Sequence, residues 1–324
     1  MARSEELSST AGQASLAGTL TLPDAPPVDD AGRGYPNVLL LGSWMPRHRE
    51  GAWDRAGHPT WFAPAAGREP GLLARLAAAL ADWGVASLRC DPRGCGASDG
   101  AWESVPLFTK IDDARDMLAA MRSHGQLDLR RTGLLGHGEG AVIALSVAIG
   151  DPAVGALTLI GPPARSWRDV LRRGVATRSR TGTDREHPIV AALDRWSEDV
   201  IERAQRREDF FDLRLPGGEV VRLGLAGVEQ AIHTPALALA SMIHRSISLV
   251  HGEADAWSDP DESALLASVL AESGNQPSRR IVESGGHDLD EASDALIGEL
   301  ADDLAARLQP RDLPPVLVAL EGMG

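Results

Sequence analysis

Three glycine-bounded segments of this sequence carry residues that suit catalysis by proton transfer. Residues 136–140 read Gly-His-Gly-Glu-Gly between a predicted strand and a predicted helix, with Gly138 at the centre. Asp255 ends the segment His-Gly-Glu-Ala-Asp, residues 251–255, and His287 follows two glycines after the last predicted strand. An aspartate can orient a histidine ring and stabilise its cation. Asp255 and His287 therefore predict a base that moves protons.

Short apolar runs alternate with amphipathic stretches along most of the chain, which predicts an α/β fold with a mostly parallel sheet flanked by helices. Residues 91–100 contain three glycines and a proline, so they predict a loop. The predicted strands are 38–42, 85–90, 132–137, 156–160, 247–251 and 279–282, and the predicted helices are 71–83, 110–122 and 139–149. Loops that follow the strands of such a sheet surround its ligand site, so the three catalytic segments are expected to meet there.

The long stretch between the strands 156–160 and 247–251 predicts an insertion. We divide the chain into a first part of the core domain (1–163), a cap (164–243) and a second part of the core domain (244–324). The charged positions of residues 165–214 suit solvated helix faces, so a helical cap is expected between the sixth and seventh strands. Its aromatic residues suit either the core of the cap or the lining of a pocket.

The overall composition excludes several classes of function. The chain has 324 residues and a net charge of −14, which argues against a nucleic-acid partner. No apolar run approaches the roughly 18 residues that span a bilayer, and residues 1–6 have no apolar signal core, so no membrane partner and a cytoplasmic location are expected. Cys90 and Cys95 are too few for a disulfide framework. His48, His58 and His233 have no ligand-spaced partners, so neither a metal nor a cofactor is expected.

At this level the chain resembles the cap-bearing members of the α/β-hydrolase superfamily, of the bacterial serine-peptidase and esterase type, over residues 15–308. The resemblance rests on residues 39–43 (Leu-Leu-Leu-Gly-Ser), 91–98 (Asp-Pro-Arg-Gly-Cys-Gly-Ala-Ser), 135–140 (Leu-Gly-His-Gly-Glu-Gly), 252–255 (Gly-Glu-Ala-Asp) and 286–287 (Gly-His). In this superfamily the centre of the strand-turn-helix elbow holds the nucleophile, followed along the chain by the acid and the histidine. Asp255 and His287 match the last two positions. Gly138 leaves the nucleophile position vacant, because it offers no oxygen, sulfur or carboxylate.

A displaced nucleophile is the main way in which such a chain could still hydrolyse its substrate. Ser146 lies two turns along the predicted helix, and the two cysteines belong to another strand and its loop. Ser43 is expected near the oxyanion-hole loop, too far from the elbow to contact the histidine. Backbone donors remain at Glu139 and in the loop of Ser43 and Trp44. A site with a base and no nucleophile suits proton abstraction next to a carbonyl or imine.

Aromatic residues are numerous in the loops expected around this site. Trp44, Trp53, Trp61 and Trp102 are many for a solvated rim, and a large apolar ligand would explain them. The residues predicted to bind substrate are Ser43, Trp44, His137, Glu139, Trp102, Phe108, Trp167, Trp196 and Trp257.

Within the superfamily the chain resembles the atypical epimerases of bottromycin biosynthesis, on the overall hydrolase pattern with Gly138 at the elbow. The resemblance implies a partner that is a modified macrocyclic precursor peptide, ribosomally made, in which an L-aspartyl residue next to a thiazoline becomes D-aspartyl. The base would be His287 or the substrate's own carboxylate. Two alternatives stay open: a pseudohydrolase that only binds an apolar peptide or small molecule, and a hydrolase with a displaced nucleophile.

Overall fold

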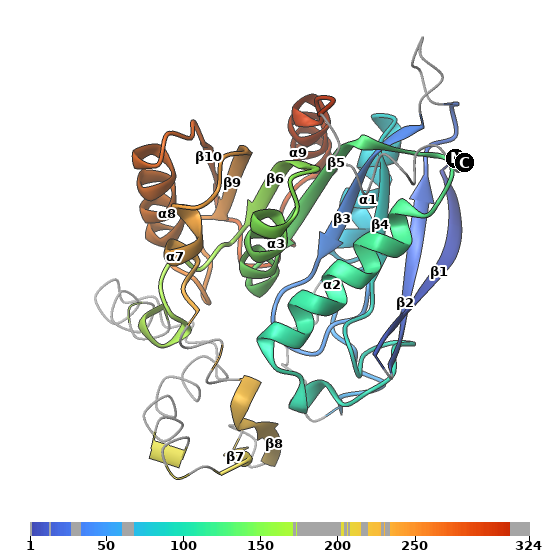
Figure 1. Cartoon of the computed structure of the whole chain (residues 1–324). Helices are drawn as coiled ribbons and strands as arrows, with labels where there is room; N and C mark the ends of the chain where they lie inside the picture. Colours follow the sequence, from blue (N-terminus) through green and yellow to red (C-terminus); the bar gives the residue numbers. More distant parts are fainter. Residues whose placement is uncertain are drawn as a thin grey trace.

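A twisted sheet forms the centre of the computed structural model, which describes residues 2–12, 14–26, 34–59, 68–170, 173, 202–203, 206, 208–214, 220–227, 230 and 234–311. In this described part the sheet has eight strands in the order β1-β2-β4-β3-β5-β6-β9-β10 (Figure 1). Pairing is antiparallel between β1 and β2 and between β2 and β4, and parallel elsewhere. The strands are β1 (Arg3–Ala11), β2 (Ala14–Leu22), β3 (Tyr35–Leu41), β4 (Ala86–Cys90), β5 (Leu127–His137), β6 (Val154–Ile160), β9 (Ser246–Gly252) and β10 (Ser278–Val282).

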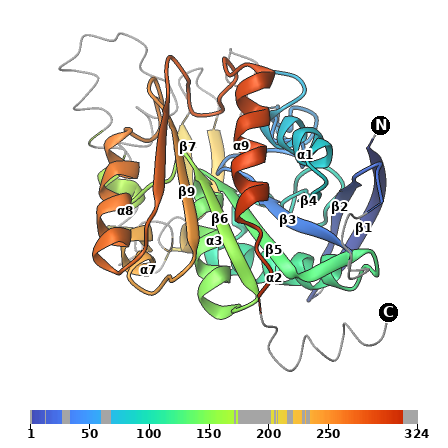
Figure 2. The same cartoon turned by 90° about the horizontal axis from the view of Figure 1, so that it is seen from above.

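Helices cover both faces of this sheet, which confirms the predicted fold class (Figure 2). One face carries α1 (Leu72–Asp82) and α9 (Asp294–Arg307), and the other carries α2 (Leu107–Arg122), α3 (Glu139–Gly150), α7 (Ala236–Ala240) and α8 (Asp261–Glu272). Each face encloses its own cluster of buried apolar side chains. The central strands therefore contact apolar layers on both sides, and this explains why β3 reads as a continuous apolar run.

The antiparallel hairpin of β1 and β2 was not predicted, because its first strand is largely exposed and polar. Gly12, with a φ of 62°, makes the turn between the two strands. Arg49 links the hairpin to the core: its guanidinium contacts Glu6 at 2.6 Å, Thr19 at 2.8 Å and Asp91 at 2.8 Å. Contacts of this kind join segments far apart in the sequence, so local periodicity does not reveal them.

The insertion lies between β6 and β9, which are the sixth and seventh strands of the sheet along the chain. A helical cap was expected, but the insertion also contains strands: β7 (Phe210–Arg214) and β8 (Val220–Gly224) form an antiparallel pair. Alternation explains this pair: along β8, Val221 and Leu223 are buried while Val220 and Arg222 are exposed. The boundaries of the cap at 164 and 243 stay predictions. Among the described residues, no helix has both the length and the apolar character needed to cross a membrane.

Candidate active site

The elbow predicted at residues 136–140 is a sharp turn between β5 and α3. Gly138 has φ 56° and ψ −118°, and its N–H donates to the carbonyl of Ile160 at 2.9 Å. Close backbone approach explains the flanking glycines: a Cβ on Gly136 would lie 2.3 Å from the oxygen of Gly140, and one on Gly140 would lie 2.4 Å from the oxygen of Leu41. The turn thus has the geometry of a nucleophile elbow, with a glycine at its centre.

Asp255 and His287 meet beside this elbow. Nδ1 of His287 lies 2.8 Å from Oδ2 of Asp255, and both side chains are buried. The other carboxylate oxygen accepts from the backbone N–H groups of Trp257 at 2.8 Å and Ser258 at 2.9 Å. His251, which the sequence did not single out, places Nε2 3.3 Å from Oδ2 of the aspartate. The carboxylate therefore accepts from the His287 ring and from two backbone N–H groups, with the His251 ring beside it, and it holds the imidazole of His287 in turn.

The two buried groups shift each other's pKa in opposite directions. Burial by itself would raise the pKa of Asp255, but the charge of His287 and the hydrogen bonds from His251 and His287 outweigh it and hold the pKa well below its usual value. Burial would lower the pKa of His287, but the Asp255 carboxylate outweighs that effect and raises it. The aspartate therefore stays ionised at neutral pH and stabilises the imidazolium that a base forms when it takes a proton.

Ser43 lies in contact with this histidine, so the expectation that it cannot reach the elbow is wrong. Its Oγ is 3.0 Å from Nε2 of His287. A Cβ built on Gly138 would lie 2.2 Å from Oγ of Ser43 and 2.9 Å from Nε2 of His287. The Ser43 hydroxyl thus occupies the space that a side chain at the elbow would need. The position that the sequence shows as vacant is filled from the loop that follows the neighbouring strand β3.

The register of the sheet explains how Ser43 reaches this place. The strands β3 and β5 are parallel neighbours, and Leu41 pairs with Gly136. Two residues further along each chain, Ser43 and Gly138 therefore stand side by side. The strand order of the α/β-hydrolase superfamily could have predicted this contact. From the sequence, Ser43 was assigned only to the loop that follows its strand.

The other nucleophiles considered from the sequence do not contact the histidine in the described residues. Oγ of Ser146 donates to the carbonyl of Val142 within α3. Burial raises the pKa of the thiols of Cys90 and Cys95, which disfavours the reactive thiolate. Ser43 is thus the described nucleophile that is paired with His287.

His137 and Glu139, on either side of Gly138, have different surroundings. Nε2 of His137 lies 2.9 Å from the backbone oxygen of His287, and the two rings are 4.6 Å apart between centroids. Burial lowers the pKa of His137 to about 3, so this ring stays neutral and positions the segment of His287. Oε2 of Glu139 accepts from Nζ of Lys110 at 2.7 Å, and both side chains are largely buried. Lys110 was not among the predicted site residues.

The aromatic residues predicted to bind substrate are only partly gathered at the site. Trp102 is buried and packs against Trp44 with ring centroids 5.7 Å apart. Trp257 is buried with its ring 6.2 Å from that of His287. Phe108 is 53% exposed, so its ring faces solvent. Trp167, near the start of the insertion, is half-buried. Trp61 and Trp196 lie outside the described residues.

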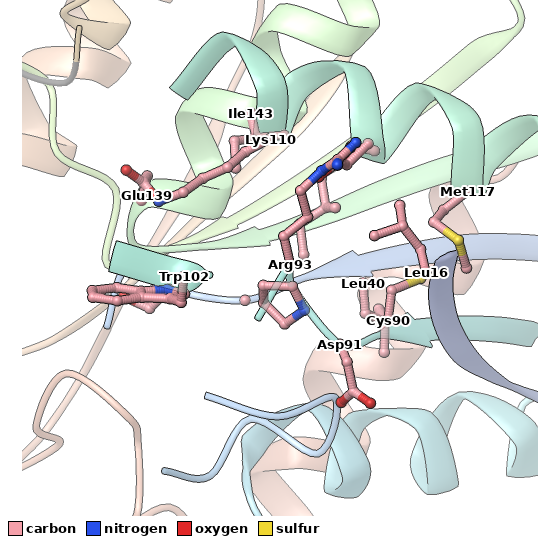
Figure 3. Close-up of a pocket in the computed structure, with 16 residues that line it drawn as sticks. Leu16, Leu40, Cys90, Asp91, Arg93, Trp102, Lys110, Met117, Glu139 and Ile143 are labelled. Carbon is pink, nitrogen blue, oxygen red and sulfur yellow. The ribbon is translucent and has the colours of Figure 1, made fainter. Parts of the chain in front are cut away.

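A pocket that is partly open to solvent lies beside Ser43. In Figure 3, Glu139, Lys110 and Trp102 lie at one end, and Leu16, Cys90 and Met117 lie at the other. Backbone and side chains of 40–43 and 90–93 form the rest of the wall together with α2 and α3. The pocket thus reaches from the Ser43 hydroxyl into an interior lined by apolar side chains and by the paired side chains of Arg93 and Asp113.

Within the part of the chain that the structure describes, two groups of side chains have the composition of metal ligands: Asp54 with His58 and Cys95, and His137 with His287 and Asp288. The expectation that His58 has no carboxylate or cysteine partner is therefore wrong. Both of its ring nitrogens already face oxygen atoms, Nδ1 at 3.0 Å from Glu103 and Nε2 at 2.7 Å from the carbonyl of Gly94. An ion would have to replace these contacts, so the group is explained by hydrogen bonding alone.

Comparison with known structures shows the same fold in several enzymes. Est1E from Butyrivibrio proteoclasticus with bound ferulic acid is 14% identical over 93% of this chain and 98% of its own, with a TM-score of 0.63. DcsB in complex with its substrate analogue is 13% identical over 95% of this chain and 99% of its own, with a TM-score of 0.62. The acylaminoacyl peptidase of Pyrococcus horikoshii is 12% identical over 99% of this chain and 44% of its own, with a TM-score of 0.63.

A comparison with curated protein sequences finds no match. The model of the family described as serine aminopeptidase S33 matches residues 65–290, which contain the elbow, Asp255 and His287. The chain therefore belongs to the serine aminopeptidase S33 family, within the α/β-hydrolase superfamily.

Proposed function

We propose that this protein is a serine hydrolase of ester or amide substrates whose nucleophile is Ser43 instead of a residue at the elbow. One observation carries the proposal: Oγ of Ser43 lies 3.0 Å from Nε2 of His287, whose Nδ1 is held by Asp255. Nucleophile, base and orienting acid are recognised by such geometry and not by their order in the sequence.

The arrangement supports a two-step acyl transfer. Oγ of Ser43 attacks the substrate carbonyl carbon while Nε2 of His287 takes the hydroxyl proton, and Asp255 stabilises the imidazolium. The oxyanion is stabilised by the backbone N–H of Glu139 at the start of α3, where the helix dipole favours negative charge. The imidazolium then gives its proton to the leaving group, which leaves an acyl-Ser43 ester. Water attacks this ester with His287 as base, and the carboxylic acid and the free serine result.

The family supports this chemistry, because its name describes a serine peptidase. The structural neighbours include an esterase domain from a Rhodothermus marinus protein and the acylaminoacyl peptidase named above. These likenesses support the reaction class.

A serine-directed fluorophosphonate tests the proposal. We expect one covalent adduct, located by peptide mass analysis on the peptide that contains Ser43. Ser43→Ala should abolish the adduct and lower the rate on p-nitrophenyl acetate by about 10⁴-fold or more. Ser146→Ala is the matched control, since Ser146 bonds within its own helix. An unlabelled wild-type protein, or a Ser43→Ala variant with the wild-type rate, would exclude Ser43 as the nucleophile.

A second candidate function is epimerisation of an L-aspartyl residue next to a thiazoline in a bottromycin-type macrocyclic peptide. It is favoured by Gly138, which leaves the elbow without a side chain, while His287 and Asp255 keep the ability to move a proton. In this reaction Ser43 would only hold the imidazole. Incubation in D2O with a thiazoline-bearing aspartyl peptide distinguishes the epimerase from the hydrolase. Gain of one deuteron and a new diastereomer, equally in wild type and Ser43→Ala, would favour the epimerase. Peptide binding without exchange or hydrolysis would favour a pseudohydrolase.

A further inference from the structure

The wall of the pocket next to Ser43 contains a buried ion pair that the proposed acyl transfer does not use. Nζ of Lys110 donates to Oε2 of Glu139 at 2.7 Å. The side chains are 14% and 5% exposed, and both line the pocket together with Ser43. Nζ of Lys110 also lies 5.7 Å from the centre of the Trp102 ring, on the same side of the pocket (Figure 3).

The chemistry of this pair is that of a matched donor and acceptor. An ammonium group has three N–H donors, of which Glu139 takes one, and a carboxylate has two oxygens. The pair has no net charge, so it does not favour a free anion or a free cation. It favours a neutral ligand group that accepts one hydrogen bond and donates another. A secondary amide is the common organic group with these two properties.

The choice of lysine at position 110 agrees with a role of the pair in the pocket. Lys110 is the single lysine of the sequence, and arginine serves at all other basic positions. Surface charge does not require this choice, because the Lys110 side chain is largely buried in the pocket wall. A lysine is a compact point charge with rotatable donors, which suits a ligand oxygen that approaches from inside the pocket.

Beyond the ion pair the lining is mixed. Leu16, Leu40, Cys90 and Met117 line the pocket there together with Arg93 and Asp113, whose side chains pair with each other at 2.6 Å. The space there suits an uncharged group, because the charges of Arg93 and Asp113 are already paired and burial of an unpaired charge is costly.

We infer that the Lys110–Glu139 pair recognises a secondary amide in the acyl part of the substrate, so that the substrates are esters or amides of short N-acylated amino acids. The amide carbonyl accepts from Nζ of Lys110, and the amide N–H donates to a carboxylate oxygen of Glu139. A small uncharged group beyond the amide fills the far end of the pocket. The inference rests on the proposed function, since it takes Ser43 to be the reacting group.

Three p-nitrophenyl esters of equal chain length test this specificity: pentanoyl, 4-oxopentanoyl and N-acetylglycyl. The first has no hydrogen-bonding group in the chain, the second has an acceptor, and the third has the full amide. After subtraction of the enzyme-free rates, we expect kcat/KM to increase in this order. The amide ester should exceed the pentanoyl ester by about 10- to 100-fold, the usual effect of a hydrogen bond to a charged group.

Two variants assign this preference to the ion pair. Lys110→Met should lower kcat/KM for the N-acetylglycyl ester by about 10- to 100-fold and for the pentanoyl ester by less than about threefold. Because Lys110→Met leaves Glu139 buried without its partner, the double variant Lys110→Met/Glu139→Gln keeps the test valid if the single variant folds poorly. Asp112→Asn, on an exposed position of the same helix, is the control. An unchanged ratio between the two esters in both variants would overturn the inference.

A binding measurement keeps this inference separate from the proposed function. Protein grown with lysine labelled at Cε by carbon-13 gives one side-chain NMR signal, because Lys110 is the single lysine. In Ser43→Ala, N-acetylglycine methyl ester should shift this signal to saturation, and methyl pentanoate should not. If this result is obtained and the wild-type protein does not hydrolyse the esters, the proposed hydrolase is rejected and the amide site is kept. Equal shifts with the two esters, or no shift with either, would reject the amide site even if the fluorophosphonate forms its adduct on Ser43.

Discussion

An exchange of residues between the loop after β3 and the elbow tests whether Ser43 replaces the elbow nucleophile. In Gly138→Ser, the new Cβ would lie 2.2 Å from Oγ and 3.0 Å from Cβ of Ser43, so the two serines cannot keep their places together. The new side chain also sits at a φ of 56°, a conformation that costs about 1–3 kcal/mol for a residue other than glycine. We expect this single variant to be less stable and less active than wild type, because Ser43 is pushed away from His287.

The opposite single variant, Ser43→Gly, removes the hydroxyl and the Cβ that cause the collision. Loss of a nucleophile costs about 10⁴- to 10⁶-fold in kcat. In the double variant Ser43→Gly/Gly138→Ser, a hydroxyl returns to the same space from the elbow. Its Cβ would lie 2.9 Å from Nε2 of His287, so the ring has to move by a few tenths of an ångström. We therefore expect partial recovery, at least about tenfold above Ser43→Gly, as expected for a serine within reach of its base.

The assay combines rate and location. Hydrolysis of p-nitrophenyl acetate gives the rates, urea unfolding shows that each variant is folded, and fluorophosphonate labelling gives the position of the nucleophile. The adduct should be on the peptide containing position 43 in wild type and on the peptide containing position 138 in the double variant. A folded double variant that is no faster than Ser43→Gly, or a Gly138→Ser variant with full activity and its adduct at position 43, would refute the replacement of the elbow nucleophile by Ser43.

Three further predictions follow from buried groups. Because the Asp255 carboxylate raises the pKa of His287 above 6.5 and the base must be neutral, kcat/KM should fall as the pH decreases through that raised pKa. Asp255→Asn should move this acidic limb to lower pH and reduce kcat by about 10⁴-fold, which a pH–rate profile of both proteins will show. Glu262, fully buried, accepts from the backbone N–H groups of Ala164 at 3.1 Å and Arg165 at 3.0 Å and pairs with the Arg165 side chain. Its replacement by alanine should reduce the free energy of unfolding in urea by about 3–5 kcal/mol, and a smaller loss for glutamine would agree with this role. The two cysteines should react with Ellman's reagent only after denaturation, because burial raises the pKa of both thiols; rapid reaction of the native protein would contradict this.

Local patterns in the sequence were sufficient for the elements that present the site. Runs of apolar residues located β3, β4, β6, β9 and the second half of β5 within a few residues, because central strands are buried on both faces. The edge strand β10 is mostly exposed and was also located, to within one residue. The glycines at 136, 138 and 140 predicted the sharp turn, because each avoids a steric collision with the nearby backbone or side chains. Asp255 and His287 were recognisable because each follows a strand that ends at the same edge of the sheet.

Contacts between distant segments were decided by the tertiary structure alone. The hairpin of β1 and β2, the strands β7 and β8 of the insertion, and the pairing of Lys110 with Glu139 depend on partners that local periodicity does not reveal. Ser43 is the main case. By itself the sequence determined that the elbow has no nucleophile, since Gly138 has no side chain. Only the parallel register of β3 and β5 decided that a hydroxyl stands there nonetheless, because it aligns residue 43 with residue 138 at hydrogen-bonding distance from the histidine.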